Sequence, residues 1–416
     1  MSRTRIAWDT QLGIAVAGIT TTSIGPALPF LILEHGLSLT VAGSVFAFFS
    51  GGRASSVLLS TVIAERFSRK ALLLTGHTCF AVGLVAFALS PLFLLHLVAI
   101  GVAGLGFGFT DAISNAVISE VFPERRGFAL NRLHAFFGIG SVVGPMFAGL
   151  VLALGGHWRI IFAVAAVIAI SVAVFTALTD IPDGGNNPSD GETQSDGSTQ
   201  SDEEMQSGSE PKGAPGNVTS DRHGVLSSTV RFLTKPALIL PAFSVLIFTG
   251  VTHGLIGWMN TYFEEVMGAS ATVATIVLLA YNSGITLGRV VCGVYADRLG
   301  FRPTLILNAA AAAVSLLAAA MTRSIILAAV AYTLGGFFLA GITPMAVAIA
   351  TTFESARAGE TAARMFVFGA TGSLIIPFLM GAVSDYFSLD VGIGFVGFLV
   401  AIIIFLGAGI PRTLPD

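Results

Sequence analysis

Twelve apolar runs of about 20 residues, separated by short polar turns, dominate this sequence of 416 residues. A helix of about 20 apolar residues crosses the hydrocarbon core of a bilayer and satisfies its own backbone hydrogen bonds there. Charged residues make up only 11% of the chain, less than half of the roughly 25% typical of soluble domains. The sequence therefore predicts an all-α membrane protein with twelve transmembrane helices, near residues 10–33, 40–63, 71–90, 94–120, 129–154, 159–179, 237–261, 271–295, 304–321, 325–351, 362–384 and 390–410.

The basic residues of the loops predict the orientation of these helices. Apart from Arg159 and Arg323, the loop Lys and Arg residues fall on the side that holds both chain ends. Positively charged loops stay on the cytoplasmic side, so we expect a multi-pass plasma-membrane protein with both termini in the cytoplasm. The first run is long enough to span, and we interpret it as an uncleaved helix. The two cysteines, Cys79 and Cys292, lie inside apolar runs and favour neither a disulfide framework nor a metal site.

A polar insert divides the runs into two groups of six. The stretch from Asp180 to Arg222 holds ten carboxylates and two basic side chains, with almost no large apolar residue. Such a segment cannot bury enough surface to fold. We therefore predict an N-terminal six-helix half (1–180), a disordered cytoplasmic linker (181–235) and a C-terminal six-helix half (236–416). For the linker, a solvated tether and a regulatory or partner-binding tail both remain open.

The two groups of runs repeat each other at an offset of 232 residues. This shift places RLHAFFGIGSVVGPMFAG, from Arg132, on RMFVFGATGSLIIPFLMG, from Arg364, and it also places Arg66 on Arg298. Because six spans separate the copies, both have the same membrane orientation. The sequence thus predicts pseudo-symmetric parallel repeats, the arrangement of transporters that rock one half against the other.

Two short loops carry related charged motifs, GVYADRLGFRP from Gly293 and TVIAERFSRK from Thr61. They resemble the loop signature of the major facilitator superfamily, and the resemblance covers essentially the whole chain. A carboxylate at a helix end can accept hydrogen bonds from the N-terminus of a neighbouring helix, so the motif is expected to latch the cytoplasmic ends together in an outward-open state. The predicted gating residues are Gly293, Asp297, Arg298, Gly300, Arg302, Glu65 and Arg66.

A glycine- and proline-rich string lies in the fifth predicted span. It holds Gly140, Gly144 and Pro145, and the second repeat keeps Pro377. The string resembles the Gly-Pro motif of proton-coupled drug antiporters in the same superfamily. Small residues four apart also let helix backbones approach closely, and a proline kinks a helix. Close packing and an antiport signature therefore both remain open for these residues.

Few ionisable residues lie well inside a predicted span. Asp111 is the single carboxylate among them, and Arg53 lies at a similar depth. Such a charge costs at least about 2.5 kcal/mol at mid-span and usually marks a pathway. Desolvation disfavours its charged form, so Asp111 is expected to bind and release a proton near neutral pH. A static ion pair with Arg53 is the alternative. His253 is either a further proton carrier or an interior histidine.

The segment GLGFGFTDAISNAV resembles the fucose:proton symporter group of sugar permeases. In that group an acidic residue four positions before an asparagine takes part in proton and sugar handling, and Asp111 and Asn115 stand in that relation. The first-span carboxylate of those symporters has no counterpart in TTTSIGPALPF. The expected substrate-binding residues, whose amides, hydroxyls and aromatic faces suit a sugar and also an amphipathic drug, are Asn115, Trp258, Asn260, Tyr262 and Asn282. Trp258 and Tyr262 are alternatively interfacial belt residues.

These patterns predict a secondary transporter, and not an enzyme, that takes up a sugar or another small polar solute with protons by alternating access. Proton-coupled efflux of a drug or metabolite is the alternative, and a receptor or scaffold would leave Asp111 without a role. We expect no cofactor, with the proton gradient as the energy source. The expected partners are a small-molecule substrate and the lipid bilayer. Scattered basic residues argue against nucleic acid, and we expect a monomer.

Overall fold

The structure, a computed structural model, describes residues 3–63, 66–181 and 231–411. All regular structure in these ranges is helical. The long helices are α1 (Arg3–His35), α2 (Leu39–Ile63), α3 (Arg69–Leu89), α4 (Phe93–Val121), α5 (Arg126–Ala153), α6 (Arg159–Ala177), α8 (Pro236–Glu265), α9 (Ala271–Leu299), α10 (Phe301–Met321), α11 (Ile325–Leu339), α12 (Ile342–Phe353), α13 (Ala358–Tyr386) and α14 (Leu389–Gly409), with short 3₁₀ turns η1 (Pro123–Arg125) and η2 (Ser355–Arg357).

The twelve predicted spans correspond to these helices, and the predicted all-α membrane fold is confirmed. The tenth span is interrupted at Ala340 and Gly341, between α11 and α12. A side chain at Gly341 would overlap the amide of Asn308 and the sulfur of Cys292, so these neighbours would have to shift to admit one. Within the described residues, eleven segments are long and apolar enough to cross a membrane. The remaining helix, α2, is 25 residues long and so also has spanning length.

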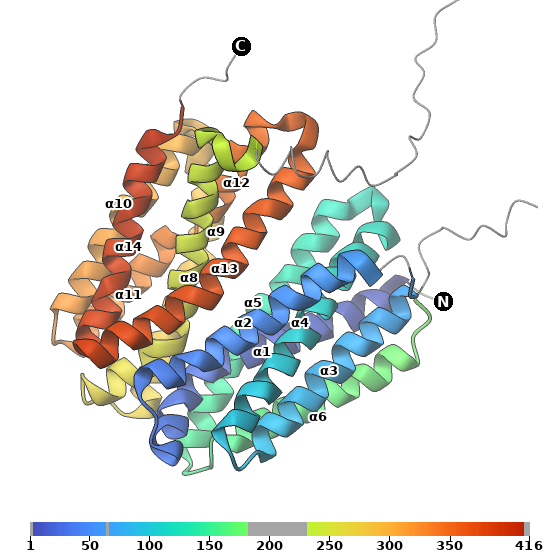
Figure 1. The fold of residues 1–416 in the computed structure, drawn as a ribbon, viewed down its shortest axis with the longest axis horizontal. Helices are drawn as coiled ribbons and strands as arrows, with labels where there is room; N and C mark the ends of the chain where they lie inside the picture. Colours follow the sequence, from blue (N-terminus) through green and yellow to red (C-terminus); the bar gives the residue numbers. More distant parts are fainter. Residues whose placement is uncertain (1–2, 64–65, 182–230, 412–416) are drawn as a thin grey trace, which may run out of the picture.

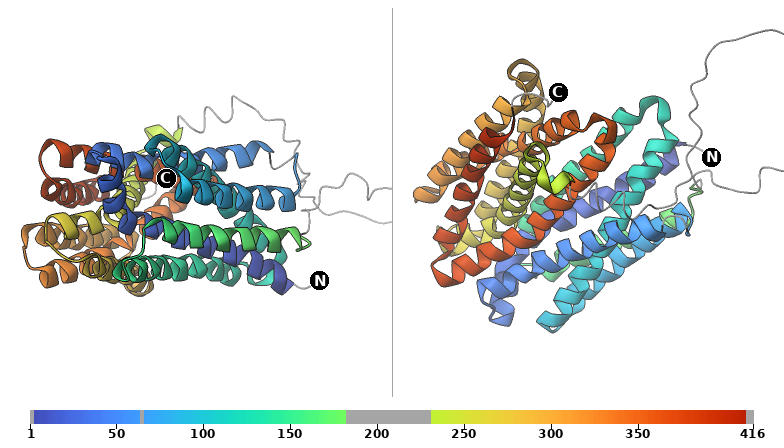
Figure 2. Two further views of the ribbon diagram at one scale, coloured as in Figure 1. Left: turned by 90° about the horizontal axis from the view of Figure 1, so that it is seen from below. Right: turned by 45° about the horizontal axis from the view of Figure 1, so that its top comes forward.

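The two halves repeat one packing arrangement (Figures 1 and 2). In the N-terminal half α1 packs on α5, α2 on α4, and α3 on both α4 and α6. In the C-terminal half the corresponding pairs are α8 with α13, α9 with α11, and α10 with both α11 and α14. The offset of 232 residues thus relates three-dimensional contacts as well as sequence letters. Contacts between the halves come from α2 with α13, α5 with α9, and α1 with α8.

The halves meet at one end of the bundle and separate toward the other. We call the end that holds Arg3 and Ile410 the terminal end, and the opposite one the far end. Figure 1 shows α2 and α13 close together at the far end and diverging toward the terminal end. Midway along these helices, the Ser50 hydroxyl still donates a hydrogen bond to the carbonyl oxygen of Ser373 (3.2 Å). The space between the halves therefore opens toward the terminal end.

Glycines account for the close approach of helices within each half. Side chains at Gly140 and Gly18 would overlap backbone atoms across the contact between α5 and α1. Gly144 likewise contacts the carbonyl oxygen of Ile19. Gly372, which the repeat aligns with Gly140, contacts Leu246 of α8 in the same manner. The glycine string of the fifth span thus has a packing role in this structure, and Pro145 and Pro377 lie inside α5 and α13.

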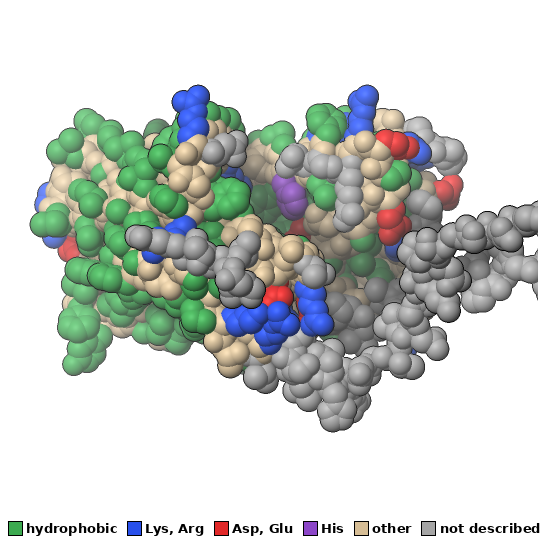
Figure 3. Space-filling model, turned by 90° about the horizontal axis from the view of Figure 1, so that it is seen from above, with side chains coloured by type: hydrophobic (Ala, Val, Ile, Leu, Met, Phe, Trp, Pro, Cys, Tyr) green, Lys and Arg blue, Asp and Glu red, His purple; other side chains and the backbone are tan. Residues whose placement is uncertain are grey.

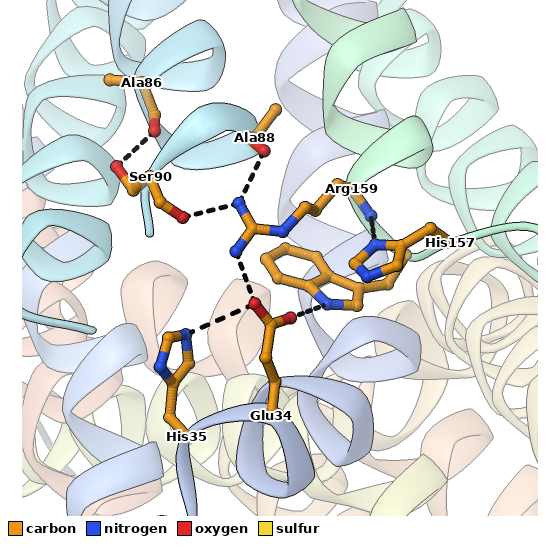
Figure 4. A network of polar contacts seen from close by, with 8 residues as sticks. Glu34, His35, Ala86, Ala88, Ser90, His157 and Arg159 are labelled. Atoms are coloured by element: carbon orange, nitrogen blue, oxygen red, sulfur yellow. Dashed lines mark hydrogen bonds and ion pairs between the residues drawn. The ribbon is translucent and has the colours of Figure 1, made fainter. Parts of the chain in front are cut away.

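A polar network fixes the far end of the N-terminal half (Figure 4). Glu34 accepts hydrogen bonds from Nε1 of Trp158 (2.8 Å) and from the guanidinium of Arg159 (2.5 Å). The same guanidinium donates to the carbonyl oxygens of Ala88 (2.9 Å) and Ser90 (2.6 Å) at the end of α3. The last carbonyls of a helix have no partner within it. Arg159 therefore caps the C-terminal end of α3 and links it to α1 and α6.

Most of the predicted linker, residues 182–230, lies outside the described residues. Its end is described, because residues 231–234 are helical and Lys235 precedes α8. Glu354, just after α12, pairs with Nζ of Lys235 and with Arg231, each at 2.9 Å. The linker end is therefore held against the terminal end of the C-terminal half.

This ion pair gives a pH-dependent prediction. The hydrogen bond from Lys235 lowers the pKa of Glu354 below the usual 4.5, so its stabilisation is present above pH 4.5 and is lost as the pH falls through the folded-state pKa. Glu354→Gln should cost roughly 1 kcal/mol at pH 7, because the partners are half-exposed. Thermal unfolding of both proteins at pH 7 and at acid pH checks this. Glu124→Gln is the control, and it is expected to change little because the ion pair of Glu124 with Arg3 is exposed on both sides. An equal loss at both pH values would contradict the assignment.

Candidate functional site

The predicted charges in the N-terminal half form an ion pair. Nη2 of Arg53 on α2 lies 2.8 Å from Oδ2 of Asp111 on α4. Asn115, one turn further along α4, donates from Nδ2 to Oδ1 of Asp111 (3.1 Å). The guanidinium of Arg53 also lies over the ring of Phe107, 4.6 Å from its centroid. Three of the residues selected from the sequence, Arg53, Asp111 and Asn115, therefore form one polar cluster.

Small residues on α2 and α4 bring these side chains together. A side chain at Gly104 would overlap the carbonyl oxygen of Phe49, and one at Gly108 would overlap the hydroxyl of Ser56. A side chain at Gly52 would meet the backbone of α4 in the same way. This spacing lets α4 press its backbone against α2. The glycines of α4 that lie one or two turns before Asp111 thus allow the close helix contact that positions the charged pair.

The ion pair borders open space in the middle of the bundle. Asp111 is ten residues from the terminal end of α4 and Arg53 ten from that of α2, or about 15 Å along each helix. Their side chains are 21% and 35% exposed, so neither is sealed in the helix packing. Figure 3 looks down on the top of Figure 1 and shows the surface hollowed between the two halves, with a histidine side chain in the hollow. The pair is therefore accessible to water that enters from the terminal end.

His253 approaches this pair from the C-terminal half. Its Nδ1 lies 2.8 Å from the carbonyl oxygen of Thr249 on the same helix, α8. A carbonyl only accepts hydrogen bonds, so Nδ1 carries the proton and Nε2 is the ring atom left to gain one. The positive charge of Arg53 lies close enough to act on the ring of His253. Ionisable groups of the two halves therefore lie within electrostatic reach of each other.

The second repeat does not carry a matching pair. The offset of 232 aligns Asp111 with Thr343 and Arg53 with Ile285. The hydroxyl of Thr343 has no hydrogen-bond partner among the described residues. The ion pair of Asp111 with Arg53 is therefore a feature of the N-terminal half that the repeat does not duplicate at the aligned positions.

The other residues expected to bind substrate are enclosed in this conformation. Trp258 is fully buried and donates from Nε1 to the carbonyl oxygen of Pro377 (2.9 Å), where α8 meets α13. Asn260 and Tyr262 are also fully buried, and Asn260 donates to Thr275 (3.1 Å). Asn282 is 7% exposed and donates to the carbonyl oxygen of Leu278. Neither Trp258 nor Tyr262 lies at a lipid-facing surface, so the interfacial-belt interpretation is wrong for both.

Some of these buried groups lack hydrogen-bond partners. Within the described residues, the hydroxyls of Tyr262 and Tyr332 and the amide oxygen of Asn260 have none. Tyr262 and Tyr332 are adjacent, with ring centroids 6.4 Å apart. Unpartnered polar atoms in the interior are costly. This cluster therefore retains hydrogen-bonding capacity that a solute or water can fill when the far end opens.

A carboxylate that sequence analysis missed closes the far end. Asp385, near the end of α13, accepts hydrogen bonds from the backbone N–H groups of Leu39 (2.8 Å) and Thr40 (2.7 Å) at the start of α2. The first N–H groups of a helix have no partner within it and carry partial positive charge. Asp385 thus caps a helix of the other half. Its position near a helix end was the available signal, but its partner is 346 residues away.

Glycines bring the two halves into contact at the same end. A side chain at Gly25 of α1 would overlap the carbonyl oxygen of Ile256 on α8, and one at Gly381 of α13 would crowd that of Leu39 on α2. Gly257, which the repeat aligns with Gly25, contacts the ring of Phe46. The closed far end therefore depends on backbone contacts across the two halves.

At the terminal end, the described part of the predicted gating motif contacts only its own half. Gly300 has φ +85°, which favours glycine between α9 and α10. Arg302 donates to the carbonyl oxygens of Gly407 (3.0 Å) and Ala408 (2.7 Å) at the end of α14. Gly293, Arg298 and Arg66 are exposed or face open space, while Glu65 and the side chain of Asp297 lie outside the described residues.

An apolar groove elsewhere does not belong to this site. It lies between α3 and α6 with a cavity volume of about 510 Å³, and its wall includes Val82, Val85 and Ile170. Val82 and Ile170 are exposed on the outer surface of the N-terminal half. Aliphatic side chains of this kind suit lipid chains, so we exclude the groove from the polar pathway.

Comparisons with known proteins agree with this architecture. A family model described as Major Facilitator Superfamily matches residues 11–330. Two curated proteins of Mycobacterium tuberculosis, an uncharacterized MFS-type transporter and the multidrug resistance protein Stp, are each 30% identical over 41% and 39% of this chain. A TsgA homolog of Citrobacter koseri is 23% identical over 45% of it. The matched segments cover 24%, 31% and 48% of these relatives, so the chain spans between about a quarter and a half of their lengths.

Solved structures match over nearly the whole chain. A D-xylose-proton symporter gives a TM-score of 0.75 at 14% identity and covers 100% of this chain and 98% of its own. A mutant form of the nucleoside transporter NupG gives 0.77 at 13% identity, covering 98% and 99%. A bacterial homolog of the lysosomal transporter Spinster, in an inward-facing and unoccupied conformation, gives 0.72 at 16% identity, covering 99% and 95%. At these identities the likeness concerns the fold.

Proposed function

The chain belongs to the major facilitator superfamily, and we propose that it is a proton-coupled transporter that takes up a sugar or another small polar solute. A membrane transporter of this superfamily moves its solute by secondary transport, with no cofactor and, in our proposal, with the proton gradient as the energy source. The observation that carries the proposal is the ion pair between Asp111 and Arg53, partly exposed in the middle of the bundle and within electrostatic reach of His253.

Protonation of Asp111 is the coupling step in this proposal. The ionised carboxylate holds Arg53 at 2.8 Å, and a proton removes that attraction. The guanidinium is then free to donate hydrogen bonds to solute hydroxyls, which match its planar fork of donors. Nε2 of His253 supplies an acceptor on the opposite half. Proton and solute thus bind one cluster, and both leave when it faces the cytoplasm.

The orientation follows from the loop charges. With both termini in the cytoplasm of the plasma membrane, the terminal end is cytoplasmic and the far end is external. The hollow between the halves then opens to the cytoplasm, and Asp385 closes the outside. The motif at Gly293 forms its latch across the halves in the outward-open state, which accounts for its exposure here. The likeness to the inward-facing Spinster homolog supports this assignment.

The choice of solute rests on chemistry and on the comparisons. The buried tyrosine hydroxyls and the amide of Asn260 offer neutral hydrogen-bonding partners to a polyhydroxylated molecule. The D-xylose-proton symporter and the nucleoside transporter NupG support a sugar-like solute. The match to the multidrug resistance protein Stp instead favours proton-coupled efflux of a drug or metabolite as the second candidate. The protein acts as a monomer in both cases.

An uptake screen tests the proposal. Purified protein in proteoliposomes is given radiolabelled pentoses, hexoses, nucleosides, small carboxylates and lipophilic cations, with and without an inward proton gradient. We expect a sugar or nucleoside to accumulate only with the gradient and to leave when a protonophore is added. Accumulation that ignores the protonophore would contradict proton coupling. Gradient-driven loss of a lipophilic cation from loaded vesicles would favour the efflux candidate.

A further inference from the structure

A second cluster of ionisable side chains is buried inside the N-terminal half. Asp9 on α1, His77 on α3 and Thr176 on α6 are 0%, 2% and 0% exposed. The hydroxyl oxygen of Thr176 lies 2.7 Å from Oδ1 of Asp9 and 2.8 Å from Nδ1 of His77. Sequence analysis did not select Asp9, because the first predicted span begins one residue after it. The hydroxyl therefore bridges a carboxyl group and an imidazole that no part of the proposed transport step uses.

The surrounding helices enclose this cluster. A side chain at Gly13 of α1 would overlap Nε2 of His77, and one at Gly76 of α3 would crowd the hydroxyl of Thr110 on α4. Toward the terminal end lies an apolar cluster that covers the site, formed by Ile6, Leu72, Leu73, Ile113, Val117, Val121 and Ile181. Thr110 faces this interior, while the next residue, Asp111, faces the space between the halves. The two clusters thus lie on different faces of α4, about 100° apart around the helix.

The hydrogen bonds restrict where protons can be. Thr176 has one hydroxyl proton but three neighbours, since its oxygen is also 2.9 Å from the carbonyl oxygen of Val172. When Thr176 donates to ionised Asp9, His77 must donate from Nδ1. When Asp9 is protonated and donates to Thr176, the hydroxyl can donate onward to Nδ1 of a ring protonated at Nε2. With a neutral ring, the second arrangement holds one proton more than the first.

Two further atoms of the cluster are able to form hydrogen bonds but make none. Oδ2 of Asp9 and Nε2 of His77 are buried without a hydrogen-bond partner among the described residues. An ionised carboxylate in this position is costly, because a lone charge in the interior loses its hydration. One added proton neutralises the cluster, either on the carboxyl group or as an imidazolium that faces the carboxylate through the hydroxyl. The pair therefore titrates as one unit.

Charged groups pack around the site from several helices. Lys70 of α3 acts electrostatically on Asp9, and Arg5 of α1 lies over the ring of Phe175 on α6. With the amide of Gln11 turned so that its oxygen faces α5, that oxygen accepts hydrogen bonds from the guanidinium of Arg132 at 2.8 and 2.9 Å. The nearest group presented by α4 is the uncharged Thr110, and α6 contributes Thr176 to the cluster. The described cations lie around the cluster without pairing directly with the carboxyl group.

We infer that Asp9, Thr176 and His77 form a second proton-binding site, enclosed within the N-terminal half, which gains one proton on acidification and releases it on alkalinisation. The site is separate from Asp111 and requires no transported solute. It goes beyond the proposed function, because its proton binding is expected whether the solute is a sugar or a drug.

Infrared difference spectroscopy of the lipid-reconstituted protein tests this inference. Lowering the pH through about 8 to 4, where carboxyl and imidazole groups in proteins titrate, should raise the carbonyl-stretch band of a protonated carboxyl group. In an Asp111→Asn background the contribution of Asp9 should remain among the bands of the other carboxyl groups, and adding Asp9→Asn should remove that contribution alone. A parallel titration with a pH dye should show one proton fewer taken up per chain. Spectra and proton uptake unchanged by Asp9→Asn would overturn the inference.

Two further variants keep the test informative if Asp9→Asn does not fold. Asp9→Glu retains the carboxyl group and should shift the band without removing it. Thr176→Val retains both ionisable groups but removes the hydroxyl bridge, so the midpoint of the band's titration should move. A band that keeps its frequency in Asp9→Glu would show that it belongs to another carboxyl group. A midpoint unchanged in Thr176→Val would disprove the coupling of Asp9 with His77.

Discussion

Asp111→Asn is expected to abolish accumulation of the solute against its gradient while leaving exchange of solute across the membrane intact. Asparagine nearly matches aspartate in shape but cannot gain or lose a proton. One pH unit supplies about 1.4 kcal/mol per proton, so an imposed difference of two units drives roughly 100-fold accumulation in a one-proton symporter. In the variant the internal and external concentrations should become equal, because the binding site still alternates but no proton accompanies the solute.

Uptake and counterflow in proteoliposomes measure these two activities separately. Asp390→Asn is the matched control, since Asp390 also pairs with an arginine, Arg323, at 2.8 and 3.0 Å, but does so at the far end outside the hollow. The control should accumulate solute like the parent protein. Undiminished accumulation by Asp111→Asn would rule out its role as the proton carrier and favour a static ion pair with Arg53.

Gly25→Ala is expected to prevent the far end from closing. The new Cβ would overlap the carbonyl oxygen of Ile256 on the other half, and backbone atoms cannot move aside as a flexible side chain can. Overpacking of this kind costs about 1–3 kcal/mol, which corresponds to a population shift of roughly 5- to 150-fold away from the conformation described. Transport should slow in proportion, because each cycle must pass through that conformation.

Trp258 reports directly on this closure. It is fully buried where α8 meets α13, and the chain has only three tryptophans. In a background with Trp8→Phe and Trp158→Phe, Gly25→Ala should expose Trp258 to a water-soluble quencher. Gly138→Ala is the control, since nothing lies within 4 Å of a side chain added there. Equal quenching in both variants would show that the contact at Gly25 does not gate the far end.

Features carried by long stretches of sequence were predictable. The helices follow from the length of each apolar run, and the arrangement of the halves follows from the repeat. The ion pair of Asp111 with Arg53 was anticipated as an alternative, because counting residues from the helix ends gives depth. Depth does not give the direction of a side chain, however. Trp258 has the depth of a residue lining the pathway, yet it points into the contact between α8 and α13.

Features that depend on distant partners were not predictable. Asp385 and the start of α2 are separated by almost the whole chain, and no local pattern indicates that they meet. From its position in the sequence, Asp9 is expected to lie near a loop and to be solvated. It is buried only because α3 and α6 pack against α1. The close packing at Gly341 likewise involves Asn308 and Cys292 from neighbouring helices. Each case requires knowledge of helix packing, which a single sequence does not contain.

The central claim, proton-coupled uptake through Asp111, is tested most directly by proton movement itself. Proteoliposomes are loaded with a pH-sensitive dye and given a sugar from outside, with Asp111→Asn vesicles in parallel. Our account predicts that the lumen acidifies as the sugar enters and that the variant shows no such change. Sugar entry without acidification, or alkalinisation evoked instead by a lipophilic cation, would contradict it.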